Sequence, residues 1–468
     1  MPIINYKYGN IIKNCIKNVF NKEIELKQIN NYLDFINYLD GFLLNIVKKS
    51  IIDSFESIDI EFKNTDRRKE LYYTKGLYPR TIMTLFGEVT FQREYYVPKN
   101  RNTDGFFYVD QLFNLPKRDY YDPMIKALII EKSSQFSYIQ SGEIVGDMIG
   151  TKFKSMTDSI HSKISRQTVY NVIKNADMNY VIDDVKANID TIYIQFDEKY
   201  VYTQGTNKLK KEIKAAVIYT GIEEEYKGRN KLVNRHVITS LGYSQDIKNK
   251  CLDYIFKTYD TNKISTVMIS GDGAQWIKKS TGDFYFHENI TVHFILDRFH
   301  MNQAVNHITK DDDIKYYLRD YIYNNKRKFF KELCDILIIE NPLRSEIIEN
   351  NKNYIVNHWV PIQKQKHSLF LGCSMEGHIS HVLAAPFSSR PKAHSLHMLA
   401  KRLRIREIYV NKLDPKQIYL NNHVDPVPEF SYAESNVRYP KTILDVIGHK
   451  VTSKYILFRN LRNSTIFS

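Results

Sequence analysis

Apolar residues recur every three or four positions in the N-terminal part of the chain. One set of six follows this spacing: Leu26, Ile29, Leu33, Ile36, Leu43 and Val47. Such spacing is typical of an amphipathic helix, because one helical turn contains 3.6 residues. The pattern predicts that residues 11–57 are largely helical.

A different pattern follows between Arg80 and Val97, where β-branched and aromatic residues lie on both sides of Phe86-Gly87. This segment predicts a β-hairpin with its turn at that dipeptide. Residues 101–118 then carry Asn, Asp, Gly and Pro, which is typical of a linker.

Three short helices are predicted in the segment that begins at Pro123. The first is expected to start at this residue, because Pro is favoured at the first position of a helix. In the third helix Ser165 is the expected N-cap, which places Arg166, Gln167 and Thr168 in the exposed first turn. A recognition helix presents polar side chains to the DNA major groove in this way. A three-helix packing unit without a DNA contact has the same caps, so both interpretations stand.

Strands alternate with helices from about residue 189. The apolar and β-branched runs are T-I-Y-I-Q-F-D-E-K-Y-V-Y-T-Q, K-E-I-K-A-A-V-I-Y-T-G, R-H-V-I-T-S-L-G, S-T-V-M-I-S-G-D-G and T-V-H-F-I-L-D-R-F-H, with a helix near 244–258 after the third. This order predicts a mixed α/β domain. Residues 309–358 are charged and lack β-branched alternation, which predicts an all-helical insertion.

The patterns divide the chain into five regions. They are an N-terminal helical region with a β-hairpin (1–118), a helix-turn-helix-like DNA-binding region (119–185), an α/β catalytic domain (186–308 and 359–406), a helical insertion (309–358) and a basic C-terminal tail (407–468). A chain of 468 residues is long enough for several such units.

The amino-acid composition gives the chain a positive net charge. The chain has 67 Lys and Arg against 53 Asp and Glu, a formal net charge of +14, and this excess favours a polyanionic partner such as nucleic acid. AT-rich coding also raises the Lys content, and it is the alternative explanation. With 43% hydrophobic and 13% aromatic residues the chain is not intrinsically disordered.

The cysteines and the N-terminus bear on the compartment. Cys15, Cys251, Cys334 and Cys373 lie far apart, which fits a reducing environment. No cationic start precedes an apolar run, and no stretch approaches the roughly 20 apolar residues of a membrane span. We therefore expect a soluble cytoplasmic protein without a membrane contact.

Acidic residues follow two of the apolar runs. Asp197 ends I-Y-I-Q-F-D, and Asp272 ends V-M-I-S-G-D and precedes Gly273. Two acids at strand ends suggest one rim of one sheet, although such an Asp often only forms a turn or caps a helix. Glu376, in C-S-M-E-G-H-I-S-H-V-L-A, is the third candidate.

Seven short motifs carry a family resemblance that covers most of residues 75–400. They are R-T-I-M-T-L-F-G-E-V-T-F-Q-R-E-Y-Y, I-S-R-Q-T-V, F-D-E-K-Y-V, S-G-D-G-A-Q-W-I, L-D-R-F-H, M-E-G-H-I-S-H-V-L-A and S-S-R-P. Together they resemble bacterial insertion-sequence transposases of the Asp-Asp-Glu type, distantly like the Mutator group. The likeness is greatest to a long-uncharacterised transposase family of low-GC bacteria, which includes transposase-like proteins of mycoplasma integrative conjugative elements. Pro386-Phe387 stands where that family has Arg-Met, and His394 stands where it has an aromatic residue.

The resemblance implies an RNase H-like mixed sheet with Asp197 on its first strand, Asp272 after its fourth and Glu376 on a helix beyond the insertion. It also implies a DNA transposase that acts on terminal repeats and target DNA, as a homo-oligomer on the DNA. Two Mg²⁺ or Mn²⁺ ions held by these three acids would activate the entering oxygen and stabilise the leaving one. Carboxylates suit this task, because Mg²⁺ prefers hard oxygen ligands.

Other residues are alternative candidates for metal binding or for contact with a DNA phosphate. Asp297 in L-D-R-F-H ends another apolar run, and with His300 it could replace or assist one of the three acids. Ser389 and Arg390 could clamp a DNA phosphate or form a loop. The alternatives for the whole protein are a non-catalytic helix-turn-helix DNA-binding protein of a mobile element and an RNase H-like structure-specific nuclease.

Two further clusters have open interpretations. Four histidines form two H-x-x-H pairs that could bind zinc: His378, His381, His394 and His397. Four cations at Lys401, Arg402, Arg404 and Arg406 either track DNA or form a solvated helix face. The chain lacks G-x-x-x-x-G-K-[ST], so this nucleotide-binding motif gives no reason to expect ATP-driven chemistry.

Overall fold

The computed structural model describes residues 32–100, 104–113, 115–150, 164–204, 210–388 and 393–423; among these, the side chains at 33–35, 37 and 376 are not described. No helix in these ranges is long and apolar enough to cross a lipid bilayer. The described residues contain both helices and a mixed sheet, so the protein is of the α/β type.

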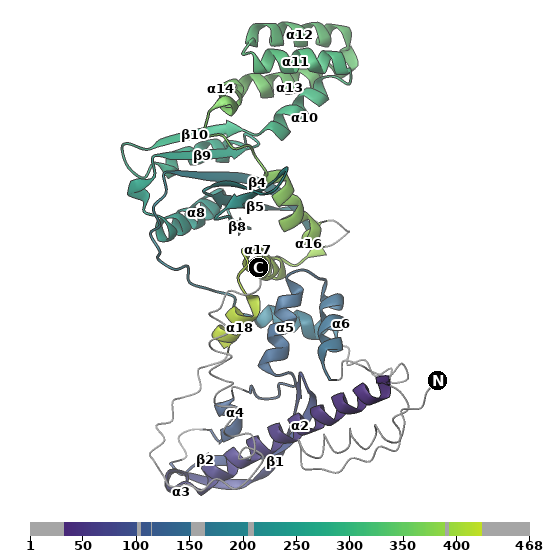
Figure 1. Ribbon diagram of the computed structural model, residues 1–468, viewed down its shortest axis with the longest axis vertical. Helices are drawn as coiled ribbons and strands as arrows, with labels where there is room; N and C mark the ends of the chain where they lie inside the picture. The colour runs from purple at the N-terminus through teal and green to yellow at the C-terminus, as the bar shows by residue number, and fades with distance from the viewer. Residues whose placement is uncertain are drawn as a thin grey trace. The chain divides into compact units, whose positions relative to one another are not determined.

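The N-terminal part is a long helix against a β-hairpin. Helix α2 (Tyr32–Asn64) packs on the hairpin strands β1 (Tyr72–Thr84) and β2 (Gly87–Pro98), with the short helix α3 (Asp66–Leu71) between them in the chain (Figure 1). The helix predicted over 11–57 is confirmed from Tyr32 onward and continues to Asn64; residues 11–31 lie outside the described part. The predicted hairpin is also confirmed, with Thr84 paired to Gly87 across the turn.

The prediction of a linker over 101–118 is wrong in its middle. Strand β3 (Phe106–Phe107) pairs with β2, and helix α4 (Tyr108–Leu112) follows it. Val109 and Leu115 are buried in the cluster that joins α2 to the hairpin. Apolar residues between the polar ones therefore fold this segment onto the hairpin.

The three helices predicted after Pro123 are present as α5 (Pro123–Ser133), α6 (Tyr138–Met148) and α7 (Arg166–Asn175). The N-cap of α7 is Ser165, whose side chain accepts a hydrogen bond from the Thr168 backbone amide over 3.1 Å. These helices share one apolar cluster with α17 (Leu396–Val410) and α18 (Pro415–His423). The boundary predicted at 407 therefore falls inside α17, and the compact unit that contains the sheet extends to Asp425.

The main sheet has the strand order β10-β9-β4-β5-β8, with the short β11 (Ala393–His394) paired to the end of β4 (Figure 1). Its strands are β4 (Thr191–Thr203), β5 (Lys210–Tyr219), β8 (His236–Ser240), β9 (Thr266–Gly271) and β10 (Thr291–Leu296). Strands β4, β9 and β10 run parallel, and β5 is antiparallel to both β4 and β8. A separate hairpin of β6 (Gly221–Tyr226) and β7 (Arg229–Val233) joins β5 to β8, and the sequence patterns did not predict it.

Helices cover both faces of this sheet. The even-numbered β4 residues Ile192, Ile194 and Phe196 pack against α8 (Ser244–Thr258) and α9 (Gln275–Ser280), which continues into η2 (Thr281–Phe284). The odd-numbered Tyr193 faces the opposite cluster, which includes residues of α17. Side chains alternate between the two faces along a strand, so Gln195 and Asp197 share the face of Tyr193.

A helical lobe follows β10. It comprises α10 (Arg298–Ile308), α11 (Asp312–Tyr323), α12 (Arg327–Glu340), α13 (Ser345–Asn357) and α14 (Trp359–Gln363) (Figure 1). Two 3₁₀ turns belong to it, η3 (Pro342–Arg344) and η4 (Lys364–Lys366). The lobe has its own apolar cluster. Residues 309–358 are thus helical as predicted, and the lobe includes α10 before them and α14 after them.

Candidate functional site

Three aspartates lie next to one another where the pairing between the parallel strands β4, β9 and β10 ends. In the β4–β9 ladder the last paired residues are Gln195 and Ser270, so Asp197 and Asp272 each lie two residues beyond the same pair. In the β9–β10 ladder Leu296 pairs with Gly271, and the Asp297 backbone amide donates to Gly271 O over 3.1 Å. We call Asp197, Asp272 and Asp297 the aspartate row.

Asp197 is the central member of the row, and its position differs from the prediction. It does not end β4, which continues to Thr203; it ends only the part of β4 that pairs with β9. The side chain is 8% exposed. One carboxylate oxygen accepts a hydrogen bond from the Glu198 amide over 2.7 Å, and the other has no hydrogen bond to a described residue.

The electrostatics of the row are those of crowded, poorly compensated carboxylates. The pKa of Asp197 is raised to about 6, chiefly by burial and also by the nearby charges of Asp272 and Asp297, against the opposing effects of the Glu198 amide and the charge of His300. Loss of solvent and like charges both disfavour ionisation of a carboxyl group. A bound cation would relieve both effects.

Asp272 lies in a loop that the helical lobe supports. Its carboxylate accepts a hydrogen bond from the Ala274 amide over 2.8 Å. The Tyr354 hydroxyl donates to Asp272 O, and His358 Nε2 lies 3.2 Å from Gly273 O. Gly273 has a φ of +89°, and a Cβ atom there would lie 2.4 Å from His358 Nε2. Both the turn and the close packing against α13 therefore require glycine.

Asp297 already has partners. One of its oxygens accepts from the His300 backbone amide over 2.7 Å, which makes it the N-cap of α10, and the other lies 2.7 Å from His300 Nδ1. Burial opposes protonation of His300, but the hydrogen bond to Asp297 and the charges of all three aspartates outweigh it, and the pKa of His300 is raised. Asp297 thus brings an imidazole to the row and favours its protonated form.

Glu376 lies in the short helix α15 (Met375–His378). Its side chain is outside the described part of the chain. The helix starts directly over the face of the sheet that carries Asp197, because Gln195 Oε1 accepts from the Ser374 amide over 3.1 Å. Met375 is buried in the apolar cluster of the same face. The backbone of Glu376 is therefore held near the row.

An unusual helical segment follows α15. Residues Ile379–Ala384 form the π-helix η5, and α16 (Ala385–Phe387) continues it. The Ala385 amide donates to Ser380 O, which leaves His381 O without its usual donor, and Pro386 has no amide to donate to Val382 O. Arg406 of α17 donates to both carbonyls, over 2.7 Å to His381 O and 3.4 Å to Val382 O.

The donor set of the row fits a hard divalent cation, since carboxylate oxygens are the ligands that Mg²⁺ prefers. Asp197 and Asp272 each have one oxygen without a hydrogen bond to a described residue. Within the described side chains, which do not include Glu376, no three or more His, Cys, Asp or Glu groups converge closely enough to hold a metal ion. Completion of such a site therefore falls to Glu376 or to a movement of Asp297.

The predicted DNA-contacting residues are partly described. Arg166 and Gln167 are exposed on the first turn of α7, and Thr168 is half-buried, with its hydroxyl 2.9 Å from that of Ser165. The buried residues Val169 and Ile173 face the cluster, as predicted. Ser389 and Arg390 lie outside the described residues.

The basic stretch at 401–406 is not a solvated helix face, because its four cations are buried or half-buried, so that interpretation is wrong, whereas a DNA contact stays a prediction. Its side chains bind backbone carbonyls of the helical region: Lys401 to Ala176 O, Arg402 to Phe136 O, Arg404 to Met178 O and Arg406 to Ser134 O. Cations commonly satisfy the unpaired carbonyls near helix C-termini. The stretch therefore fastens α17 to the ends of α5 and α7.

The four histidines do not form one cluster. His378 and His381 line a pocket, with His378 Nδ1 2.9 Å from Ser374 O. His394 is buried in β11, and His397 is exposed on α17. The described residues contain no zinc site of three or more such ligands.

The protein is thus of the mixed α/β class, with an aspartate row on its main sheet and a helical lobe after β10. Residues 33–422 match the model of an uncharacterised protein family, UPF0236, and the chain belongs to this family. A UPF0236 protein of Caldanaerobacter subterraneus subsp. tengcongensis is 29% identical over 416 residues, which cover 86% of this chain and 82% of that protein. A second from the same organism, TTE2489, is 28% identical over 384 residues, covering 79% of this chain and 77% of its own.

Proposed function

We propose that the protein is a DNA transposase with an RNase H-like catalytic domain. One observation carries the proposal: the aspartate row lies at the end of the parallel pairing, beneath the helix that contains Glu376. Along the chain β4 and β9 are the first and fourth strands of the main sheet. These are the positions that the transposase resemblance implies for the first two acids.

The roles follow from the contacts. Asp197 and Asp272 offer free carboxylate oxygens, and Glu376 is the third ligand in this proposal. Two divalent ions held there would supply charge stabilisation for attack on a phosphodiester and for departure of the leaving oxygen. His300, whose protonated form Asp297 favours, would contribute positive charge toward a DNA phosphate when it is protonated. Tyr354 and His358 position the Asp272 loop.

The names of the relatives give independent support. One relative bears eleven locus designations, from TTE0033 to TTE2212, and others bear four and two. A protein assigned to many loci of one genome is expected of an element that copies itself. Together with the net charge of +14, this favours a DNA-processing protein of a mobile element.

The decisive experiment is a cleavage and strand-transfer assay with Mg²⁺ on the DNA that flanks the gene. We expect the wild-type protein to cut this DNA and to join the freed 3′-hydroxyl end to target DNA. Cutting without joining would indicate a structure-specific nuclease. Sequence-specific binding without either reaction would indicate a regulatory DNA-binding protein.

The third ligand can be identified in the same assay. We expect Glu376→Gln to abolish cleavage, because the substitution removes a carboxylate at nearly constant shape. Asp297→Asn should leave residual cleavage, because its carboxylate is already bonded to His300. The opposite ranking would place Asp297 rather than Glu376 among the metal ligands.

Recognition of the element's ends is assigned in this proposal to α7. Arg166→Ala and Gln167→Ala should each weaken specific binding by ~1–3 kcal/mol, the value of a good bidentate base contact. Thr168→Ala should have a smaller effect, because this side chain is half-buried and bonded to Ser165. Equal losses on end-sequence and random DNA would instead indicate phosphate contacts or a packing role.

A further inference from the structure

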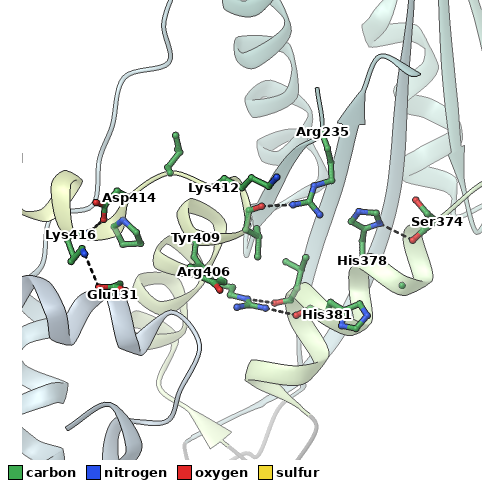
Figure 2. A pocket seen from close by; sticks show the side chains of 15 residues that line it. Glu131, Arg235, Ser374, His378, His381, Arg406, Tyr409, Lys412, Asp414 and Lys416 are labelled. Atoms are coloured by element: carbon green, nitrogen blue, oxygen red, sulfur yellow. Dashed lines mark hydrogen bonds and ion pairs between the residues drawn. The ribbon is translucent and has the colours of Figure 1, made fainter. Parts of the chain in front are cut away.

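A pocket of about 780 Å³ includes none of the aspartate row in its lining, although Ser374 and Gly377 of its wall flank Glu376. Figure 2 shows that its walls come from α5, from the residue before β8, from α15 with η5, and from α17 with the turn that leads into α18. Across the sheet Asp197 is level with Ala215 and Thr239. Arg235 lies four positions before Thr239, so the pocket begins about 13 Å from that level along the strand.

Positive charge dominates the lining. Four cationic side chains, Arg235, Arg406, Lys412 and Lys416, face two acidic ones, Glu131 and Asp414. Both acids are bonded to Lys416 or its neighbours: Glu131 pairs with Lys132 over 2.9 Å and with Lys416 over 3.3 Å, and Asp414 accepts from the Lys416 amide at the start of α18.

Three of the cations keep their charge uncompensated. Figure 2 shows with dashed lines that Arg235 donates to Val410 O and that Arg406 donates to backbone carbonyls of the pocket wall. Arg406 also donates to Ser134 O. Lys412 is exposed. Within the described residues, none of these three side chains has a carboxylate within 4 Å. The backbone contacts fix the two guanidinium groups in place while most of the N–H groups of Arg235 remain available.

The rest of the lining strengthens the charge interactions of these cations. Val382, Val410, Leu413 and Pro415 supply apolar walls, and Tyr409 lies beside them. Charge interactions are stronger next to such low-dielectric walls than in open water. Arginine groups that are held in place and surrounded by apolar surface match the planar oxygen pairs of a phosphate.

We propose that this pocket binds a phosphate group through Arg235 and Lys412. Under the proposed function, on which this assignment of the source rests, the phosphate belongs to the backbone of bound DNA outside the catalytic row. A free phosphate compound has the same chemistry, and the experiment separates the two sources.

The first arm measures DNA affinity by fluorescence anisotropy with a random-sequence duplex over a series of salt concentrations, in the Asp197→Asn background to prevent cleavage. Lys412→Glu and Arg235→Gln should each weaken binding about tenfold and lower the salt slope by about one for each lost phosphate contact. The matched control is Lys331→Glu on α12, an exposed lysine outside the pocket. It should change the affinity less than twofold.

The second arm measures the thermal midpoint and calorimetric binding with inorganic pyrophosphate. If pyrophosphate stabilises the wild-type protein but not Lys412→Glu, while DNA affinity is unchanged, the source is a small phosphate compound. If the variants lose DNA affinity and pyrophosphate has no effect, the source is DNA.

If Lys412→Glu matches Lys331→Glu in both arms, the pocket does not bind phosphate. Because Lys412 is exposed, this variant should fold even where Arg235→Gln does not. A cleavage-active protein with no effect in either arm would refute the pocket and leave the transposase proposal intact. A protein that cleaves no DNA, while Lys412→Glu still lowers the affinity for DNA or pyrophosphate, would refute the transposase proposal and leave the phosphate pocket intact.

Discussion

Two buried carboxylates on or against the main sheet have opposite surroundings. Glu407, 4% exposed, lies against the antiparallel half: it accepts from the amide and the hydroxyl of Thr239, each over 2.7 Å, and pairs with Arg404. Asp197, 8% exposed, lies in the parallel half, accepts one hydrogen bond and faces two further aspartates.

Thr239 and Asp197 lie level with each other across Ala215, so depth in the sheet does not explain the difference. A buried charge is stable when partners compensate it and costly when they do not. Glu407 therefore fastens α17 to β8, whereas Asp197 is destabilising in the metal-free protein. The structure tolerates this arrangement where a cation is expected to bind.

The largest effect should follow removal of the uncompensated acid. We expect Asp197→Asn to lower the rate of DNA cleavage by about 10³-fold or more, because a metal ion contributes several kcal/mol of charge stabilisation. DNA affinity should remain near the wild-type value. The matched control is Asp190→Asn, which changes an exposed aspartate just before the same strand. If Asp197→Asn cleaved DNA at the wild-type rate, the proposed metal site would be refuted.

The next effect is on stability against pH in the metal-free protein. The pKa of Asp197 is raised from 3.8 in the unfolded chain to about 6 in the folded state. The folded state therefore retains a proton that the unfolded chain releases, and stability is present below pH 3.8 and lost as the pH rises through 6. Asp197→Asn should be more stable than wild type by about 3 kcal/mol above pH 7.

This gain from Asp197→Asn should vanish below pH 4, and added Mg²⁺ should reduce it by stabilising only the wild type. Urea unfolding at several pH values, with and without Mg²⁺, measures both trends. A difference that does not vary with pH would mean that Asp197 is compensated in the folded protein.

Glu407→Gln should change stability in the opposite direction. Because it disturbs a buried, fully bonded carboxylate, we expect a loss of about 1–3 kcal/mol in the free energy of unfolding. Cleavage per folded molecule should stay close to wild type. Glu340→Gln, an exposed residue at the end of α12, is the control, and lost cleavage at unchanged stability would give Glu407 a chemical role.

The smallest effect concerns the segment after Glu376. Arg406→Lys keeps the charge but cannot bond two carbonyls in a fixed fork. We expect about a tenfold lower cleavage rate at saturating DNA, or ~1.4 kcal/mol. Adding Pro386→Ala, which gives Val382 O an amide donor, should restore part of the rate; a purely destabilising role would show no such rescue.

Much of the arrangement was predictable because local patterns determine it. The hairpin, the caps of α5 and α7, the five strands of the main sheet and the helical insertion follow from periodicity and capping residues. The apolar runs also marked all three aspartates of the row. Their alignment was not predictable from any single run, because it depends on which strands pair and in which register.

The residues that support the site had no local signal. Tyr354 and His358 lie 82 and 85 residues from the backbone atoms that they bind. Arg406 donates to carbonyls of the π-helix that lie 24 and 25 positions away in the sequence, and other basic side chains on α17 donate to carbonyls at distant helix ends. Such contacts depend on tertiary packing, which periodicity does not encode.

The helical lobe departs from the sheet and returns to it at almost one point. Gln365, just after α14, donates to Leu296 O at the end of β10 over 2.7 Å. A few residues could therefore bridge the two ends, and a shortened protein without the lobe should keep its sheet, since long insertions add little loop-closure entropy. The Asp272 loop would not keep its support, because Tyr354 and His358 would leave with the lobe. We therefore expect the lobe to be dispensable for folding the sheet and necessary for a rigid Asp272 loop.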